Sequence, residues 1–119
     1  MGDAEKIRKL IADNNLDLGD IPIIDPRSKS EDDRRSAFGD IFFKKRQRRG
    51  FTLYEAKKVM KERNHFGAMM VETGAADAMI SGLTRKYADP IRPALQIIGV
   101  QEGVKRVAGM YIMNTKQGP

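Results

Sequence analysis

Apolar residues recur along this chain in two patterns, one with helical spacing and one as short unbroken runs. Spacing of three to four positions predicts helices at residues 3–14, 30–49, 52–63 and 65–73, and in a segment that ends before Gly99. Short apolar runs bounded by turn residues predict strands at 21–24, 77–80 and 104–113. The run at 77–80 is mostly apolar, which suits a buried strand of a parallel sheet better than a surface strand.

Polar residues mark where two of the predicted helices meet. Ser30 is a good N-cap, acidic residues fill the turn after it, and Gly50 ends the helix that it begins. Thr52 and Glu55 have the spacing of a capping box, which starts the next helix directly afterwards. We therefore expect a sharp helix–glycine–helix corner near residue 50.

The stretch 73–99 joins a predicted strand, a loop and a helix, and we expect the rest of the chain to support it. Ser81 and Gly82 follow the strand, at the edge where open α/β sheets place ligands. A glycine there lets another molecule approach the backbone closely. The helix after the loop has two alternative starts, either an Asp89 cap followed by proline or Pro93 itself.

Three cations, Arg85, Lys86 and Arg92, lie in the loop and at the expected start of that helix. A helix N-terminus is positive, so a cation there is unfavourable by about 0.3–1 kcal/mol unless an anion binds. The three cations therefore suit a phosphate or carboxylate ligand. The alternative is that Arg85 and Lys86 are solvated and that Arg92 pairs with an internal carboxylate such as Asp77 or Asp89.

The net charge of the 119 residues is +6, and most of it lies in one place. Five cations within six residues form a basic cluster, and the rest of the chain carries only the remaining +1. The members of the basic cluster are Lys44, Lys45, Arg46, Arg48 and Arg49. Such a cluster suits a helix C-terminus, but like charges four residues apart repel each other, which favours a bound polyanion over a merely solvated face. Nucleic acid is disfavoured as the partner because the excess charge is compact and has no interleaved aromatic residues.

Composition excludes several further classes of function. The chain has no cysteine, which excludes disulfides and thiolate metal sites and leads us to expect a cytoplasmic location. His65 is the single histidine, so a metal cluster or a histidine triad is not expected, and His65 is expected to be structural or exposed. No apolar run is long enough to span a membrane. We expect one partial domain over residues 1–119, because the final extended segment ends in a turn without a returning strand.

Three motifs carry a resemblance to the phosphate acetyltransferase and butyryltransferase family: ADAMISG at 76–82, YADPIRPALQIIG at 87–99 and KRQRRGFTLYEA at 45–56. Residues 65–111 look closest to the C-terminal phosphate acetyltransferase-like module of bacterial hybrid malic enzymes. The resemblance implies an α/β three-layer sandwich with a mostly parallel sheet, of which this chain would be a part. It also implies a site for coenzyme A or acetyl-coenzyme A.

The resemblance implies roles for particular residues. Arg46, with Arg48 beside it, matches a basic position that meets the nucleotide phosphates of coenzyme A. Arg92 matches the arginine that faces the acyl-phosphate or thioester end, and Ser81–Gly82 match the loop that lines it. Arg85 and Lys86 complete the expected ligand-binding set.

Two departures from the family pattern bear on the choice between two functions. Lys86 and Tyr87 stand where acetyltransferases of the family have small hydroxyl residues, and the later catalytic motifs of the family are absent. No residue here is therefore expected to be catalytic. The first hypothesis is the regulatory acetyl-coenzyme A-binding module of an oligomeric malic enzyme, whose NADP and divalent metal would belong to a separate domain. The alternative is a truncated phosphate acetyltransferase that transfers acetyl between coenzyme A and phosphate.

Overall fold

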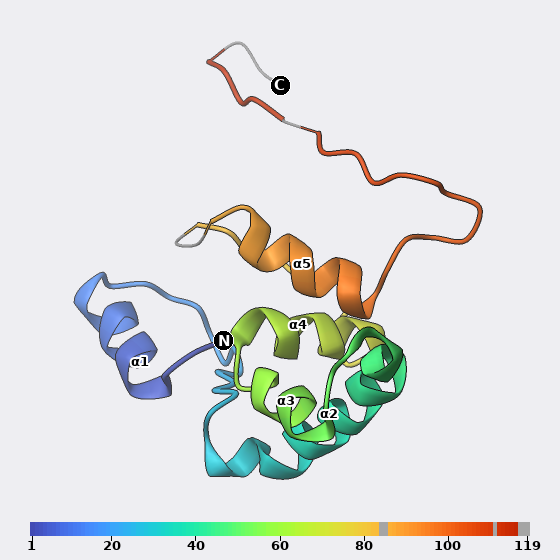
Figure 1. Ribbon diagram of the computed structural model, residues 1–119. Coiled ribbons are helices and arrows are strands. Elements are labelled where there is room, and N and C mark those ends of the chain that lie inside the picture. The colour runs from blue at the N-terminus through green and yellow to red at the C-terminus, as the bar shows by residue number, and fades with distance from the viewer. Residues whose placement is uncertain (84–85, 111, 117–119) are drawn as a thin grey trace.

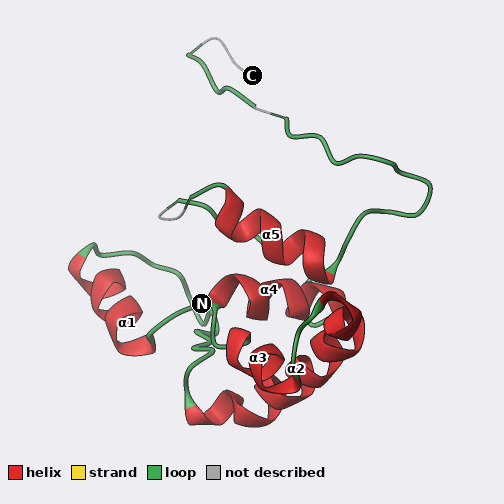
Figure 2. Ribbon diagram, viewed as in Figure 1, coloured by secondary structure: helices red, strands yellow, loops and turns green. Residues whose placement is uncertain are grey.

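The structure is a computed structural model, and it describes residues 1–83, 86–110 and 112–116. Its helices are α1 (Ala4–Asp13), α2 (Asp32–Arg46), α3 (Leu53–Val59), α4 (Arg63–Glu72) and α5 (Ala88–Ile97), with single-turn 3₁₀ helices η1 (Lys29–Glu31) and η2 (Gln47–Arg49). Figure 1 shows α2 to α5 packed together, α1 set to one side, and the segment after α5 running away from the helices as an extended tail. The described residues contain no strand (Figure 2).

The hydrophobic core lies between α2, α3, α4 and the end of α5. Phe66 of α4 is fully buried, and its ring meets Phe38 of α2 edge-on, with 5.1 Å between ring centroids. Phe42, one turn further along α2, meets Phe51 in the same geometry at 5.0 Å. The buried core residues are Phe38, Phe42, Ala56, Met60, Phe66, Ala68, Met69 and Ile97. Each buried phenylalanine stabilises the fold by about 1.5–3 kcal/mol relative to an exposed one.

The expected corner between α2 and α3 is confirmed. Gly50 has φ +87°, a left-handed conformation that suits glycine, and it follows η2. The capping box is also present, since the Thr52 hydroxyl accepts from the Glu55 N–H and the Glu55 carboxylate accepts from the Thr52 N–H. The Thr52 N–H and the Thr52 hydroxyl both donate to the Glu55 carboxylate, which lowers the pKa of this exposed carboxyl. The corner folds α3 back against α2.

A buried arginine fixes the loop that leads into α2. Arg35 donates from Nη1 to the carbonyl oxygens of Pro26 at 2.7 Å and Ser28 at 2.6 Å, and it pairs with Asp32 through Nη2. Its charge is thus satisfied within the fold. Arg35 is a structural residue, and this part of the chain's positive charge is not available to a ligand.

The three expected strands are wrong for the described residues. Residues 21–24, 77–80 and the described part of 104–113 are extended or irregular, and none of them pairs with another. A strand needs a neighbouring strand for its backbone N–H and C=O groups, and the described residues show no such ladder beside these segments. The Ile24 carbonyl instead accepts a single hydrogen bond from the Gly2 N–H at 2.9 Å. Ile80, expected to be buried, is fully exposed, whereas Met79 packs against the core. The described residues thus form an all-helical assembly with extended segments rather than the three-layer sandwich.

The start of α5 also differs from both alternatives. The helix begins at Ala88, so that Asp89 lies in its first turn and Pro93 lies inside it. Pro93 lacks an N–H, which removes one intrahelical hydrogen bond to Asp89, yet its ring is fully buried. Burial of that ring against the rest of the fold explains how the helix continues through the proline.

Candidate functional site

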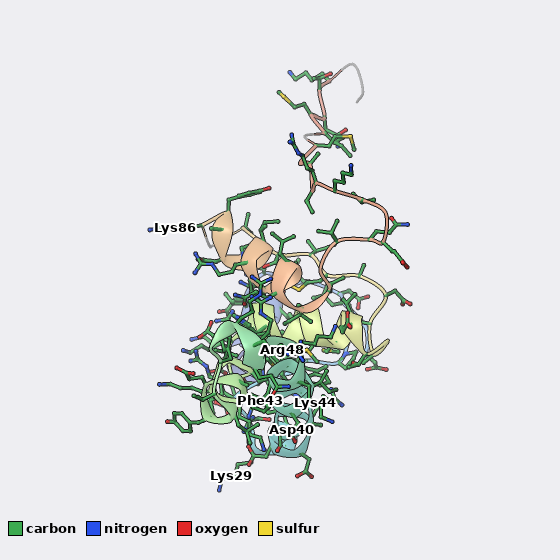
Figure 3. All side chains as sticks on the ribbon, turned by 45° about the vertical axis from the view of Figure 1, so that its right-hand side comes forward. Lys29, Asp40, Phe43, Lys44, Arg48 and Lys86 are labelled. Carbon is green, nitrogen blue, oxygen red and sulfur yellow. The ribbon has the colours of Figure 1, made fainter. Side chains whose placement is uncertain are left out.

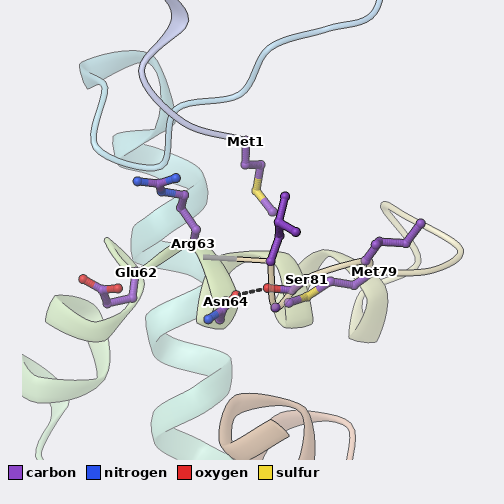
Figure 4. Close-up of a pocket in the computed structure, with 9 residues that line it drawn as sticks. Met1, Glu62, Arg63, Asn64, Met79 and Ser81 are labelled. Carbon is purple, nitrogen blue, oxygen red and sulfur yellow. Dashed lines mark hydrogen bonds between the residues drawn. The ribbon is translucent and has the colours of Figure 1, made fainter. Parts of the chain in front are cut away.

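The turn at Ser81 and Gly82 lies against the start of α4. Gly82 has φ +120°, where a side chain would be strained. The Ser81 hydroxyl donates to Oδ1 of Asn64 at 2.8 Å (Figure 4). This hydrogen bond joins the turn to the start of α4, and the turn itself belongs to no helix or strand.

Two clefts meet at this turn, and a third adjoins the first. The first has a volume of about 430 Å³ and is lined by Glu62, Asn64, Met79, Ser81 and Gly82 among others (Figure 4). The second, of about 510 Å³, lies between α4 and α5, shares Ser81 and Gly82 with the first, and has mainly apolar walls. The third, of about 220 Å³, shares Glu62 and Asn64 with the first.

Arg92 lines the third cleft together with His65 and Asp89. It is exposed, and among the described residues it forms no ion pair, so the pairing with Asp77 or Asp89 that we considered is not formed. Arg92 is the fifth residue of α5 and lies one turn inside the helix rather than at its start. Because the helix-end field decays within the first turn, the charge argument for an anion depends on the unpaired guanidinium more than on the macrodipole.

His65 is half-buried beside Arg92 and packs edge-on against Phe42, with 5.9 Å between ring centroids. Burial lowers the pKa of the His65 imidazole, an effect that a hydrogen bond with Gln96 and the charge of Glu62 partly oppose. A neutral imidazole adds no second cation next to Arg92. The expectation of a structural His65 agrees with this packing.

The basic cluster divides into a structural and a free part. Lys45 donates to the carbonyl oxygen of Ile97 at 2.8 Å and pairs with Glu72, so it joins α2 to α4 and to the end of α5. Nε of Arg46 is buried without a hydrogen-bond partner among the described residues, and Arg48 is exposed on η2. Neither Arg46 nor Arg48 forms an ion pair among the described residues, so both charges remain available to an anionic ligand.

The structure brings some of the predicted site residues together and separates others. Ser81 and Gly82 share two clefts, and Arg92 lines the cleft next to them, whereas neither Arg46 nor Arg48 lines any of the three. Lys86 is exposed and projects outward near the start of α5, and Arg48 lies over the helices below α5 (Figure 3). Arg85 lies outside the described residues.

A comparison with known families decides the relationship that these motifs indicated. The family model described as "Phosphate acetyl/butaryl transferase" matches residues 1–119, the whole chain. The chain belongs to the phosphate acetyl/butyryl transferase family.

Relatives in this transferase family cover the chain almost completely. The phosphate acetyltransferase of Thermoanaerobacterium thermosaccharolyticum is 37% identical over 113 residues, which are 95% of this chain and 33% of that protein. The Bacillus subtilis phosphate acetyltransferase is 37% identical over 114 residues, 95% of this chain and 34% of that protein. The chain therefore spans about a third of the length of these relatives. Neither relative is a malic enzyme, so they support the phosphate acetyltransferase alternative better than our first hypothesis.

Solved structures of transferases agree with this relationship. A phosphotransacetylase from Streptococcus pyogenes superposes with a TM-score of 0.79 at 34% identity, over 98% of this chain and 34% of that one. The EutD phosphotransacetylase from Staphylococcus aureus gives 0.74 at 34% identity, over 88% and 31%. The path of this chain thus follows that of family members even though its described residues form no sheet.

Sequence reasoning assigned no role to two residues of the candidate site, Asn64 and Glu62, which line both the first and the third cleft. Asn64 lies 17 residues from Ser81, and a single polar residue near a helix start gives no signal of such a partner. The described residues contain no group of three or more His, Cys, Asp or Glu that could hold a metal ion. No helix in the described part of the chain is long and apolar enough to cross a membrane.

Proposed function

We propose that this chain supplies part of the substrate site of a phosphate acetyltransferase, an enzyme that transfers an acetyl group between coenzyme A and phosphate. The observation that carries the proposal is the family match over all 119 residues, with relatives of that name at 37% identity. Both substrates are anions, since coenzyme A carries several phosphate charges. Among the described residues, Arg92 forms no ion pair, and neither do Arg46 and Arg48.

Arg92 and the Ser81–Gly82 turn are the proposed contacts for the acyl-phosphate or thioester end of the substrates. Support comes from the unpaired Arg92 guanidinium, whose planar fork matches two phosphate oxygens. Gly82 lets a substrate approach the backbone, and no Cβ blocks that approach. Lys86, and Arg85 outside the described residues, are proposed to add to the same positive field.

Arg46 and Arg48 are the proposed contacts for the nucleotide phosphates of coenzyme A. Support comes from the lack of an ion pair at Arg46 among the described residues and from the exposure of Arg48, whereas the nearby Lys45 already contacts Ile97 and Glu72. Because these residues line none of the three clefts, the proposal requires coenzyme A to extend from the Arg92 cleft toward the end of α2. The general base that removes the thiol proton is not among the residues that we assign here.

A second candidate is the acetyl-coenzyme A-binding regulatory module of a malic enzyme. Lys86 and Tyr87, in place of the family's small hydroxyl residues, favour it, and Tyr87 lines the second cleft beside Ser81. In that case the site would bind acetyl-coenzyme A without transferring its acetyl group, and NADP and a divalent metal would act in another domain.

The complete protein tests the proposal. We expect acetyl phosphate to form from acetyl-coenzyme A and phosphate, and we expect Arg92→Ala and Arg46→Ala each to lower kcat/KM by about 10- to 150-fold, because each loses a charge-assisted contact worth about 1.5–3 kcal/mol. Arg8 is an exposed arginine on α1, and Arg8→Ala is the matched control, which should keep the wild-type kcat/KM.

Two results would contradict the proposal. Acetyl phosphate formation that neither substitution alters would contradict the site. Malate-dependent reduction of NADP that acetyl-coenzyme A inhibits, without any acetyl phosphate formation, would establish the second candidate instead.

A further inference from the structure

Asn64 occupies a special place among the residues that line the clefts. It is the second residue of α4, is half-buried, and lines both the cleft at Ser81 and the cleft at Arg92. Its side chain therefore stands between the turn and the guanidinium that are proposed to bind the substrates. Figure 4 shows the Asn64 side chain meeting Ser81, with Met79 on the other side of the turn.

The hydrogen bond between these residues fixes what Ser81 can offer a ligand. A serine hydroxyl has one hydrogen to donate and two lone pairs that accept. The Ser81 hydrogen is directed at Oδ1 of Asn64, 2.8 Å away. Toward the cleft, Ser81 is then an acceptor, and it cannot donate to a phosphate oxygen at the same time.

Coenzyme A offers suitable donors along its uncharged arm, namely two amide N–H groups and the thiol S–H. Phosphate oxygens need donors instead, and Arg92 supplies five N–H donors in the adjoining cleft. The second cleft, which Ser81 also lines and which has mainly apolar walls, therefore suits the donor-bearing arm, whereas the Arg92 cleft suits an anionic group.

We infer that Asn64 is a positioning residue: by accepting the Ser81 hydrogen, it turns the Ser81 oxygen into an acceptor for an N–H or S–H donor on the uncharged arm of coenzyme A. The inference rests on the proposed function. The contact is made in the bound substrate as well as in the transition state, so its loss raises the KM for coenzyme A and leaves kcat nearly unchanged.

The test measures acetyl transfer from acetyl phosphate to coenzyme A by the complete protein. Asn64→Leu removes the acceptor, and Ser81→Ala removes the hydroxyl. Each should raise the KM for coenzyme A by about three- to tenfold, the effect of one neutral hydrogen bond. The double variant should have the same KM as either single variant, because both changes remove the same contact.

A conservative variant separates positioning from a general structural role. Asn64→Asp keeps an acceptor for the Ser81 hydrogen but places a negative charge beside Arg92. It should keep the wild-type KM for coenzyme A and raise the KM for acetyl phosphate. Asn14→Leu is the matched control, because the Asn14 amide donates to the Leu10 carbonyl at the end of α1, at 2.8 Å, and contacts none of the residues proposed to bind substrates.

Three outcomes would overturn the inference. Additive effects of Asn64→Leu and Ser81→Ala would show that the two residues act independently. An Asn64→Asp variant as impaired toward coenzyme A as Asn64→Leu would show that Asn64 does not act as an acceptor. If the wild-type protein transfers no acetyl group at all, both the proposed function and this inference fail. In the first two outcomes acetyl transfer still occurs, so the inference fails while the proposed function stands.

Discussion

Replacement of Gly39 by alanine tests the packing that holds α3 against α2. A Cβ at Gly39 would lie 2.6 Å from Cγ of Lys57, 2.9 Å from its Cα and 3.2 Å from its N. The last two atoms belong to the backbone of α3, so a rotamer change cannot relieve the clash and the helix itself must move. Overpacking of this kind costs about 1–3 kcal/mol, whereas alanine gains about 1 kcal/mol of helix propensity. Gly39→Ala should therefore lower the free energy of unfolding by up to about 2 kcal/mol.

Gly67 provides a matched comparison for Gly39 within the same fold. It is also buried in a helix, but a Cβ there would meet Cε of Met1 at 2.7 Å and Sδ of Met79 at 3.0 Å, the ends of flexible side chains. These side chains can move, so Gly67→Ala should leave stability unchanged or raise it by up to about 1 kcal/mol. Equilibrium urea unfolding of both variants measures the difference. A Gly39→Ala protein as stable as Gly67→Ala would refute the reasoning from backbone contact.

Two further predictions concern the basic cluster and His65. Lys45→Met should lower the free energy of unfolding by about 0.5–1.5 kcal/mol, because it loses partly exposed contacts with Ile97 and Glu72. Arg46→Met should instead weaken coenzyme A binding with little loss of stability. Thermal unfolding and calorimetric titration of both variants distinguish these effects, and the reverse pattern would contradict the division of the basic cluster. Because the folded-state pKa of His65 lies below its ordinary value near 6.5, the unfolded chain binds more protons and stability should fall as the pH drops through 6.5. His65→Phe should lose less stability than the wild type between pH 7 and pH 5, and parallel pH curves for the two proteins would contradict this account.

The local parts of the fold could be predicted from the sequence. The corner at Gly50 and the capping box at Thr52 depend on a few adjacent residues, and the structure confirms both. The strand predictions were wrong, because pairing depends on a neighbouring segment that the pattern of residues 77–80 does not specify. An apolar run shows that a segment needs a partner without showing which segment supplies it.

The candidate site was only partly predictable for the same physical reason. Ser81, Gly82 and Arg92 could be grouped around one loop because they are close in the chain. However, no strand precedes the turn in the described residues, and Arg92 lies one turn inside α5. The role of Lys45 as a link to Ile97, 52 residues away, and the contact between Asn64 and Ser81 depend on tertiary structure alone. A cluster of five cations also gives no sign in the sequence of which member the fold uses.

Acetyl phosphate formation by the complete protein is the most direct test of the central claim. With acetyl-coenzyme A and inorganic phosphate as substrates, we predict release of free coenzyme A together with an equal amount of acetyl phosphate, and a loss of at least about tenfold in kcat/KM for Arg92→Ala. A correctly folded protein that forms no acetyl phosphate, or one in which Arg92→Ala has the wild-type rate, would contradict the account.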